Sequence, residues 1–491
     1  MFRRISRLFI LSSVCWGALP ASAQAPEELQ KQLEDWFRQT NRRAPGMWGI
    51  AVADNQGRLL WGIQPTRPMV PASTVKLLTT GFARSVLGSD ARKATRVVGS
   101  GHLDPTSGTW IGTWGLEVNG DPTLEHQGSE TTSLTDLAAQ LAGRGIRQLN
   151  GPLAVTSASG TAQASFPSTW SVRHRGRVFA PPVGNLTVHD NQVSATLAPG
   201  KKVGQAVQLI GAAPQGAARL FTVTAKTVKG RRSRLRVEAR PDGHYVIAGT
   251  LGISARPRGV ARAATDTRVL LEAVWADALD RAGIVWNPTP GLSDGSAGSA
   301  VLAEVRSQPF DSIASEINRR SLNLGAELML QWAADNDPVA ADRLTAHVQQ
   351  ITGDYTGVHL VDGSGLSDEN RVSPYTFVSY LARFPLAPGG RNFPMLLPPN
   401  GAGTLAHLAS GLPGRGVVRA KTGTLGNVAT LVGYLGRSDG VLLISLMYNG
   451  SRVYAARQAQ WGLFRSLGAE GVVIPSDSLD VGAQLGGDPR D

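Results

Sequence analysis

The 491-residue sequence contains a single cysteine, Cys15, which lies close to the start of the chain. One thiol cannot form a disulfide within the chain or a zinc–thiolate site, and a cysteine nucleophile is excluded if the start of the chain is removed. The eight histidines are scattered, and there is no H-E-x-x-H motif of a zinc peptidase. We therefore expect no metal and no other cofactor.

Long apolar runs are also missing, because no segment reaches the roughly 18 residues that a membrane span requires. The run at 8–19 is too short, and it follows three arginines and precedes an A-S-A site that ends at Ala23. This pattern is typical of a secretory signal peptide. We expect cleavage after about Ala23 and an exported, periplasmic protein without a transmembrane anchor.

Lysine is scarce, with eight lysines among 49 basic residues, so arginine carries most of the formal net charge of +12. A general arginine bias explains this charge most simply. The charge could also attract the protein to anionic wall polymer or to lipid headgroups at a membrane surface. No basic run is interleaved with aromatic residues, so we expect no nucleic-acid partner.

The composition, with 42% hydrophobic and 18% charged residues, indicates a folded chain of two to four domains. Apolar spacing predicts helices at 26–43, 72–87, 134–143, 266–282, 311–319 and 324–334. Alternation and turn residues predict strands at 47–53, 58–63, 417–424, 430–436 and 441–448. Between about 95 and 262, short β-like runs and glycine-rich turns predict one or two inserted domains, with a basic strand pair at 226–240.

The segment Ser73-Thr74-Val75-Lys76 places a hydroxyl and an amine three residues apart, on one face of a helix start. Ser73 is a plausible nucleophile if Lys76 is neutral enough to accept its proton, and burial would lower the lysine pKa. The alternative is an ordinary helix start. Of the eight lysines, however, only Lys76 has a serine three residues before it.

The segment Ser321-Leu322-Asn323 is the only S-x-N in the sequence, and it falls between two predicted helices. A short turn there could present both polar side chains. Taken alone, a helix cap is the more common role for serine and asparagine at such a position.

The segment Lys421-Thr422-Gly423-Thr424 lies on a predicted strand, whose backbone could pair with an extended peptide. Gly423 would permit close approach to that backbone. The sequence holds a second Lys-Thr pair at Lys226, but valine follows it, and we interpret that copy as structural.

S-x-x-K, S-x-N and K-T-G in this order resemble the active-site motifs shared by penicillin-binding proteins and serine β-lactamases. The surrounding sequences, PASTVKLLT at 71–79, DGSGLS at 362–367 and AKTGTL at 420–425, are similar to those of the D-alanyl-D-alanine carboxypeptidase/endopeptidase family, the class C low-molecular-mass penicillin-binding proteins. The long segment between Lys76 and Ser321 also resembles the two nested insert domains of that family.

The resemblance implies an α+β fold, in which a helical cluster lies beside a five-stranded antiparallel sheet with Lys421 on an edge strand. Two nested, mainly β insert domains would interrupt this catalytic domain. The expected division is a signal peptide at 1–23, catalytic segments at 24–91 and 264–476, one insert at 92–115 and 191–263, a second insert nested within it at 116–190, and a flexible tail at 477–491.

For the site, the resemblance implies that Ser73 attacks the bond between two terminal D-alanines of a peptidoglycan stem peptide, with Lys76 as general base. Ser321 would relay a proton to the leaving amine, and Asn323 would orient Lys76 and the substrate. Substrate carboxylate binding would fall to Lys421, Thr422 and Thr424, with an oxyanion hole formed by the amides of Ser73 and Thr424. β-Lactams would be covalent inhibitors at Ser73.

Two alternatives remain. A β-lactamase would need a water-activating group, yet no E-P-x-L-N segment follows Ser321; a non-catalytic wall-binding protein would not need all five polar groups. The chain departs from the family at 155–166, which has no acid ahead of its phenylalanine, and at Asp368, where arginine is common. The preferred stem peptide, the balance of carboxypeptidase and endopeptidase activity, and the oligomeric state are therefore not predicted.

Overall fold

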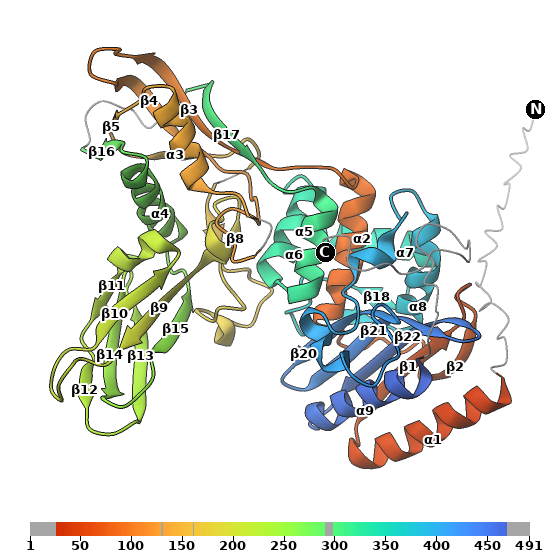
Figure 1. Ribbon diagram of the computed structural model, residues 1–491. Helices are drawn as coiled ribbons and strands as arrows, with labels where there is room; N and C mark the ends of the chain where they lie inside the picture. The colour runs from red at the N-terminus through yellow and green to blue at the C-terminus, as the bar shows by residue number, and fades with distance from the viewer. Residues whose placement is uncertain (1–25, 129–130, 161, 290–297, 469–491) are drawn as a thin grey trace, which may run out of the picture.

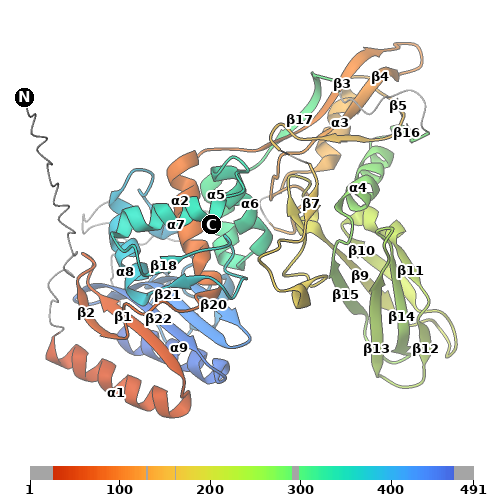
Figure 2. The ribbon, with the colours of Figure 1, turned by 180° about the vertical axis from the view of Figure 1, so that it is seen from behind.

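The computed structural model describes residues 26–128, 131–160, 162–289 and 298–468. Two lobes make up the molecule, one holding both ends of the described chain and the other holding the middle of the sequence (Figures 1 and 2). The predicted signal peptide at 1–23 and the predicted tail at 477–491 lie outside the described residues. Within the described residues, none of the helices has the length and apolar character needed to span a bilayer.

The first lobe is built on a five-stranded sheet in which every neighbouring pair is antiparallel. Strands from the start of the chain lie next to strands from its end. The strand with the K-T-G motif lies at one edge, as expected. The strands, in spatial order, are β2 (Leu59–Ile63), β1 (Met47–Ala53), β22 (Gly440–Asn449), β21 (Val428–Arg437) and β20 (Val418–Leu425).

Alternating side chains send apolar groups to both faces of this sheet. On β1, Ile50 and Val52 pack toward α1 (Glu27–Arg43) and α9 (Val453–Leu467), whereas Ala51 and Ala53 pack toward the helical cluster on the other face. The cluster contains α2 (Val75–Leu87), α5 (Phe310–Arg320), α6 (Asn323–Ala333), α7 (Ala340–Thr352) and α8 (Pro374–Arg383), with the short hairpin β18 (Val358–His359) and β19 (Arg371–Val372) beside it. The α+β class and the predicted five-stranded sheet are confirmed.

The first part of the second lobe is a mixed sheet with a helix layer. This sheet contains β16 (Val285–Asn287), β5 (Gln148–Asn150), β4 (Thr109–Glu117), β3 (Ala94–Leu103), β17 (Ala300–Arg306) and β6 (Ala154–Thr156). The helices α3 (Leu134–Gly143) and α4 (Thr267–Arg281) contribute to the same apolar core, and β7 (Ala164–Ser165) pairs with β8 (Val183–Gly184).

A β-sandwich forms the far part of this lobe. One sheet contains β10 (Gln208–Ala213), β9 (Gln192–Ala198) and β15 (Arg258–Ala263), and the other contains β11 (Phe221–Val223), β14 (Tyr245–Gly252), β12 (Lys226–Val228) and β13 (Ser233–Ala239). The basic strands β12 and β13 do not pair with each other as predicted, because each pairs with β14.

The predicted insert boundaries differ from the observed pairing. Strand β17 pairs with β3 and β16 pairs with β5, so the chain returns to the first insert sheet after the sandwich. The nested unit is therefore the sandwich at 192–263, not the segment 116–190. The described residues 264–289 and 298–306 pack with the insert instead of the catalytic lobe. We propose that the second catalytic segment begins near Phe310, at the start of α5.

Candidate active site

Ser73 lies in a short 3-10 turn (Ala72–Thr74) that leads directly into α2, and Lys76 follows in the first turn of that helix. The Lys76 ammonium nitrogen, Nζ, is 3.0 Å from Ser73 Oγ. Lys76 is fully buried, because α2 crosses the helical cluster with nearly its whole surface covered. The predicted contact of hydroxyl and amine is present.

The S-x-N segment connects α5 to α6 and reaches both lysines. Ser321 adopts a left-handed backbone conformation (φ 60°) immediately after α5, and Asn323 begins α6. Asn323 Oδ1 accepts a hydrogen bond of 2.6 Å from Lys76 Nζ, and Ser321 Oγ accepts one of 2.9 Å from Lys421 Nζ. The helix-cap interpretation holds in part: Ser321 is the C-cap of α5, where its amide donates to Ile317 O, whereas no side chain of the described residues caps the start of α6.

Lys421 and Thr422 are buried in β20, whereas Thr424 is exposed near the end of the strand. The segment 398–400 covers the outer edge of β20 only as far as Ala420, through the hydrogen bond from the Ala420 amide to Pro398 O (3.2 Å). From Lys421 onward, no strand of the described chain pairs with this edge. The backbone of the K-T-G-T segment is thus available to an extended ligand.

Gly423 is required where β20 passes the nucleophile turn. A Cβ atom at this position would lie 2.2 Å from Thr430 Oγ1, 2.7 Å from Pro71 O and 3.0 Å from the Ser73 amide nitrogen. The absence of a side chain therefore lets the strand approach Ser73. The second Lys-Thr pair lies far away in the sandwich, where Thr227 Oγ1 accepts a hydrogen bond from a loop amide and the role is structural.

Burial lowers the pKa of Lys76 from 10.5 to about 7, and the carboxylates of Asp362 and Glu327 oppose this shift only in part. A large fraction of Lys76 is then neutral near pH 7 and can accept a proton. The same amine also donates a 2.6 Å hydrogen bond to Ser364 O, which fixes its direction toward Ser73.

Arg457 is a functional candidate that the sequence analysis missed. It lies on α9 and donates hydrogen bonds to Gly423 O (2.5 Å) and Thr424 Oγ1 (3.0 Å). Burial, followed by the positive charges of Lys76 and Arg457, lowers the pKa of Lys421 well below its ordinary value. No local sequence motif indicates a role for Arg457, because its contacts arise from the packing of α9 against the sheet.

Glu327 is a second residue that was missed, one turn after Asn323 on α6. Its carboxylate accepts hydrogen bonds from the amides of Gly363 (3.1 Å) and Ser364 (2.8 Å), in the loop whose carbonyl binds Lys76. Asp362 begins that loop, and desolvation by burial raises the pKa of both carboxyls. Glu327 could have been found from its position four residues after Asn323, because this spacing places both side chains on one face of a helix.

The insert lobe forms one wall of the site. A small apolar cluster joins insert side chains to elements that carry the motifs, and Asn323 Nδ2 donates a 2.7 Å hydrogen bond to Phe179 O. The exposed Asp368 lies 3.9 Å from Arg173 of the insert. The cluster consists of Phe166, Trp170, Ala180, Val183, Leu324, Leu328, Leu366 and Leu425.

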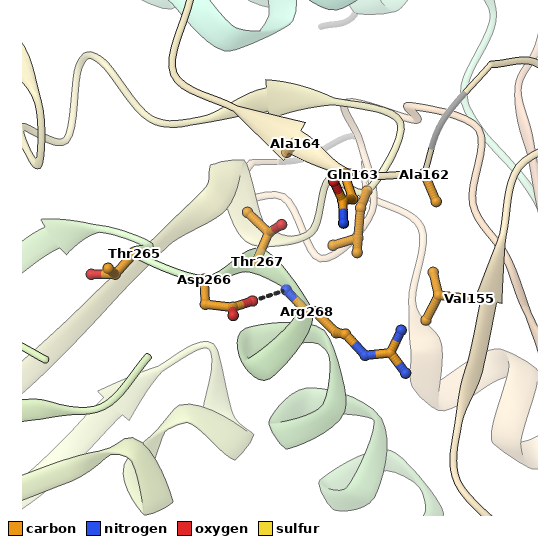
Figure 3. Close-up of a pocket in the computed structure, with 9 residues that line it drawn as sticks. Val155, Ala162, Gln163, Ala164, Thr265, Asp266, Thr267 and Arg268 are labelled. Atoms are coloured by element: carbon orange, nitrogen blue, oxygen red, sulfur yellow. Dashed lines mark hydrogen bonds between the residues drawn. The ribbon is translucent and has the colours of Figure 1, made fainter. Parts of the chain in front are cut away.

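Cavities lined by described residues lie in this wall and beside it. One of about 180 Å³ touches the whole S-x-N segment, and another of about 370 Å³ reaches Glu327 and Asp362 from the insert side. A cavity of about 460 Å³ lies inside the insert, where the side chain of Arg268 extends toward Val155 (Figure 3). None of the motif residues lines this last cavity, and its carboxylate, Asp266, caps α4. Among the described residues, no group of three or more His, Cys, Asp or Glu could hold a metal ion.

The comparisons with known proteins agree with this geometry. Residues 29–466 match the D-Ala-D-Ala carboxypeptidase 3 (S13) family. The chain is 27% identical to a D-alanyl-D-alanine carboxypeptidase from Actinomadura sp. (strain R39), over 90% of this chain and 85% of that one. It is 24% identical to the D-alanyl-D-alanine carboxypeptidase DacB from Haemophilus influenzae, over 80% and 82% of the two chains.

A solved structure shares the fold. The crystal structure of penicillin binding protein 4 (dacB) from Haemophilus influenzae superposes with a TM-score of 0.69 and 22% sequence identity, covering 87% of this chain and 99% of that one. The family match spans both lobes of the present structure, including the inserts. The chain therefore belongs to the D-Ala-D-Ala carboxypeptidase 3 (S13) family, as its three motifs predict, and it is a serine peptidase.

Proposed function

We propose that the protein is a D-alanyl-D-alanine carboxypeptidase, with DD-endopeptidase activity, that acts on peptidoglycan stem peptides through an acyl-enzyme at Ser73. The observation that carries this proposal is the fully buried Lys76, whose Nζ lies 3.0 Å from Ser73 Oγ and whose pKa is lowered to about 7. A neutral amine at this place is a general base in contact with its nucleophile.

The reaction proceeds in two halves. Ser73 Oγ attacks the carbonyl carbon of the penultimate D-alanine while its proton passes to Lys76 Nζ. The carbon–nitrogen bond then breaks, and the amine of the terminal residue leaves with a proton relayed through Ser321. Water attacks the resulting ester, and the acid product and free Ser73 are released.

The substrate is oriented by its terminal carboxylate, which binds near the cationic side chains of Lys421 and Arg457. Lys421 and Thr422, with Thr424 supported by Arg457, bind the terminal carboxylate, and Asn323 holds the peptide chain and Lys76. The amides of Ser73 and Thr424 serve as the oxyanion hole. The close approach of β20 to the Ser73 amide at Gly423 supports this placement.

β-Lactams react by the same attack, because their strained amide resembles the D-Ala-D-Ala bond. The ring-opened product stays tethered to Ser73 and hinders the entry of water, so the adduct persists. The expected export to the periplasm, where peptidoglycan lies, is part of this proposal.

The test is the intact mass of the purified protein after incubation with benzylpenicillin, followed by peptide mapping. We expect one equivalent of adduct on Ser73, and we expect Ser73→Ala to lose both the adduct and release of D-alanine from pentapeptide. Ser85→Ala is the matched control, since Ser85 lies on α2 and its hydroxyl donates a hydrogen bond to Phe82 O, outside the three motifs. An adduct that persists in Ser73→Ala would place the nucleophile elsewhere, and drug consumed without an adduct would indicate a β-lactamase.

A further inference from the structure

The positive charge of the protein is concentrated in the nested sandwich. Residues 192–263 contain thirteen lysines and arginines and only two acids, Glu238 and Asp242, which gives a formal net charge of +11. The whole chain carries +12, so the other 419 residues contribute +1. A general arginine bias would spread the charge over both lobes, and the observed concentration therefore requires a local explanation.

The basic side chains of the sandwich point into solvent. Twelve of the thirteen are exposed, and Arg262 is half-buried. Among the described residues, ion pairs reach only two of them, Arg219 with Asp280 and Arg236 with Glu238. Solvated charges that no carboxylate neutralises create a positive potential that extends about a Debye length from the surface.

Six of these residues gather at one end of the sandwich, which we call the basic tip. Three turns and a short strand meet there: the Gly204 amide donates to Thr227 O (2.9 Å), and the Ser254 amide donates to Gly230 O (3.0 Å). In both views this end, marked by β12, lies at the extremity of the insert lobe away from the helical cluster (Figures 1 and 2). The members of the basic tip are Lys201, Lys202, Lys226, Lys229, Arg231 and Arg232.

We propose that the basic tip is a docking surface for a lipid bilayer that contains anionic phospholipids. Both types of side chain bind headgroup phosphates. The lysine ammonium acts as a compact point charge, and the planar arginine guanidinium donates two parallel hydrogen bonds. Val203, between the lysines and the next strand, is 57% exposed and gives the tip an apolar group that can enter the headgroup region.

Other polyanions fit this surface less well. Both aromatic rings of the sandwich are covered, Tyr245 fully and Phe221 in part, so no ring is presented for stacking on nucleic-acid bases. The tip is formed by turns at the extremity of the insert lobe, a position from which it can approach a planar surface (Figures 1 and 2). Docking there holds the catalytic cleft away from the bilayer.

The test measures co-sedimentation of the full chain with vesicles of phosphatidylcholine alone or with about 30% phosphatidylglycerol. We expect binding only to the anionic vesicles, with a steep loss at high salt. A tip variant with Lys201→Gln, Lys202→Gln, Lys229→Gln and Arg231→Gln should bind at least about 100-fold more weakly, since each cation near an anionic surface contributes about fivefold.

The matched control removes four exposed cations from the catalytic lobe, with Lys31→Gln, Arg42→Gln, Arg43→Gln and Arg67→Gln, and should bind within about threefold of the parent. Equal losses in both variants, or no binding to anionic vesicles by the parent, would overturn the proposal. Tighter binding to soluble polyphosphate than to vesicles would also overturn it and assign the tip to a polymer. Benzylpenicillin acylation should be unchanged in both variants, so this test is independent of the proposed function.

Discussion

Glu327 and Lys76 are linked through one peptide residue, because the carboxylate of Glu327 accepts a 2.8 Å hydrogen bond from the Ser364 amide while the Ser364 carbonyl accepts a 2.6 Å hydrogen bond from Lys76 Nζ. The two groups are also close enough for the negative charge to raise the pKa of the lysine. Glu327 thus acts on Lys76 by position and by charge. We regard it as a positioning residue.

Replacement of this residue, Glu327→Gln, removes one of the charges that raise the pKa of Lys76. The midpoint of the pH profile for benzylpenicillin acylation should therefore move to lower pH, and the plateau rate should fall about tenfold as the loop loosens. Glu369→Gln, an exposed change in the same loop region, is the control. A lower plateau with an unmoved midpoint would mean that Glu327 has only a structural role.

The pH dependence of the parent protein follows from the lowered pKa of Lys76, about 7. Below this pH the amine is protonated and cannot accept the Ser73 proton, so acylation should rise about tenfold per pH unit and become level above about pH 7. The second-order rate constant for benzylpenicillin, measured by mass spectrometry from about pH 5 to pH 9, checks this sign. A flat or falling profile would contradict the assignment of Lys76 as the base.

The close approach of β20 to Ser73 at Gly423 can be tested by replacing two glycines, one at a time, with alanine. Gly423→Ala would place a methyl group 2.2 Å from Thr430 Oγ1 and 2.7 Å from Pro71 O, so β20 must move away from Ser73. Acylation should fall by about 100-fold or more, with a lower Tm. Gly426→Ala would place its methyl group more than 4 Å from every described residue except the chain neighbours, and should leave both quantities near those of the parent. Equal acylation rates and Tm values in the two variants would show that acylation does not depend on the close approach of β20 to Ser73.

The role of Arg457 is tested with Arg457→Gln. The change removes a cation that contacts Gly423 O and Thr424 Oγ1 and that lowers the pKa of Lys421. We expect kcat/KM for peptides ending in D-Ala-D-Ala to fall about tenfold or more, mainly through KM, because the proposed carboxylate site loses positive potential. Arg452→Gln, an exposed change just before α9, is the control. A loss confined to kcat would argue against carboxylate binding.

The core of the site was predictable because its residues lie in short motifs. Ser73 and Lys76 meet across one helical turn, and Lys421 lies on a strand whose alternation is visible in the sequence. Arg457 and Glu327 were missed because their roles depend on contacts between elements far apart in the chain. The nesting of the inserts was mispredicted for the same reason: the pairing of β17 with β3 joins residues about 200 positions apart, and no local pattern encodes it.

The two chain connections of the sandwich lie side by side, because Gln192, which begins β9, and Ala263, which ends β15, are register partners in adjacent strands. The chain enters and leaves through ends that lie about 5 Å apart, a gap that a tight turn can close. The unit is therefore exchangeable as a cassette, by recombination or by design. Helix α4 sets a condition on such an exchange, since apolar residues of α4 pack on the 3-10 turn Gln215–Leu220. These residues would need polar replacements in a protein without the sandwich.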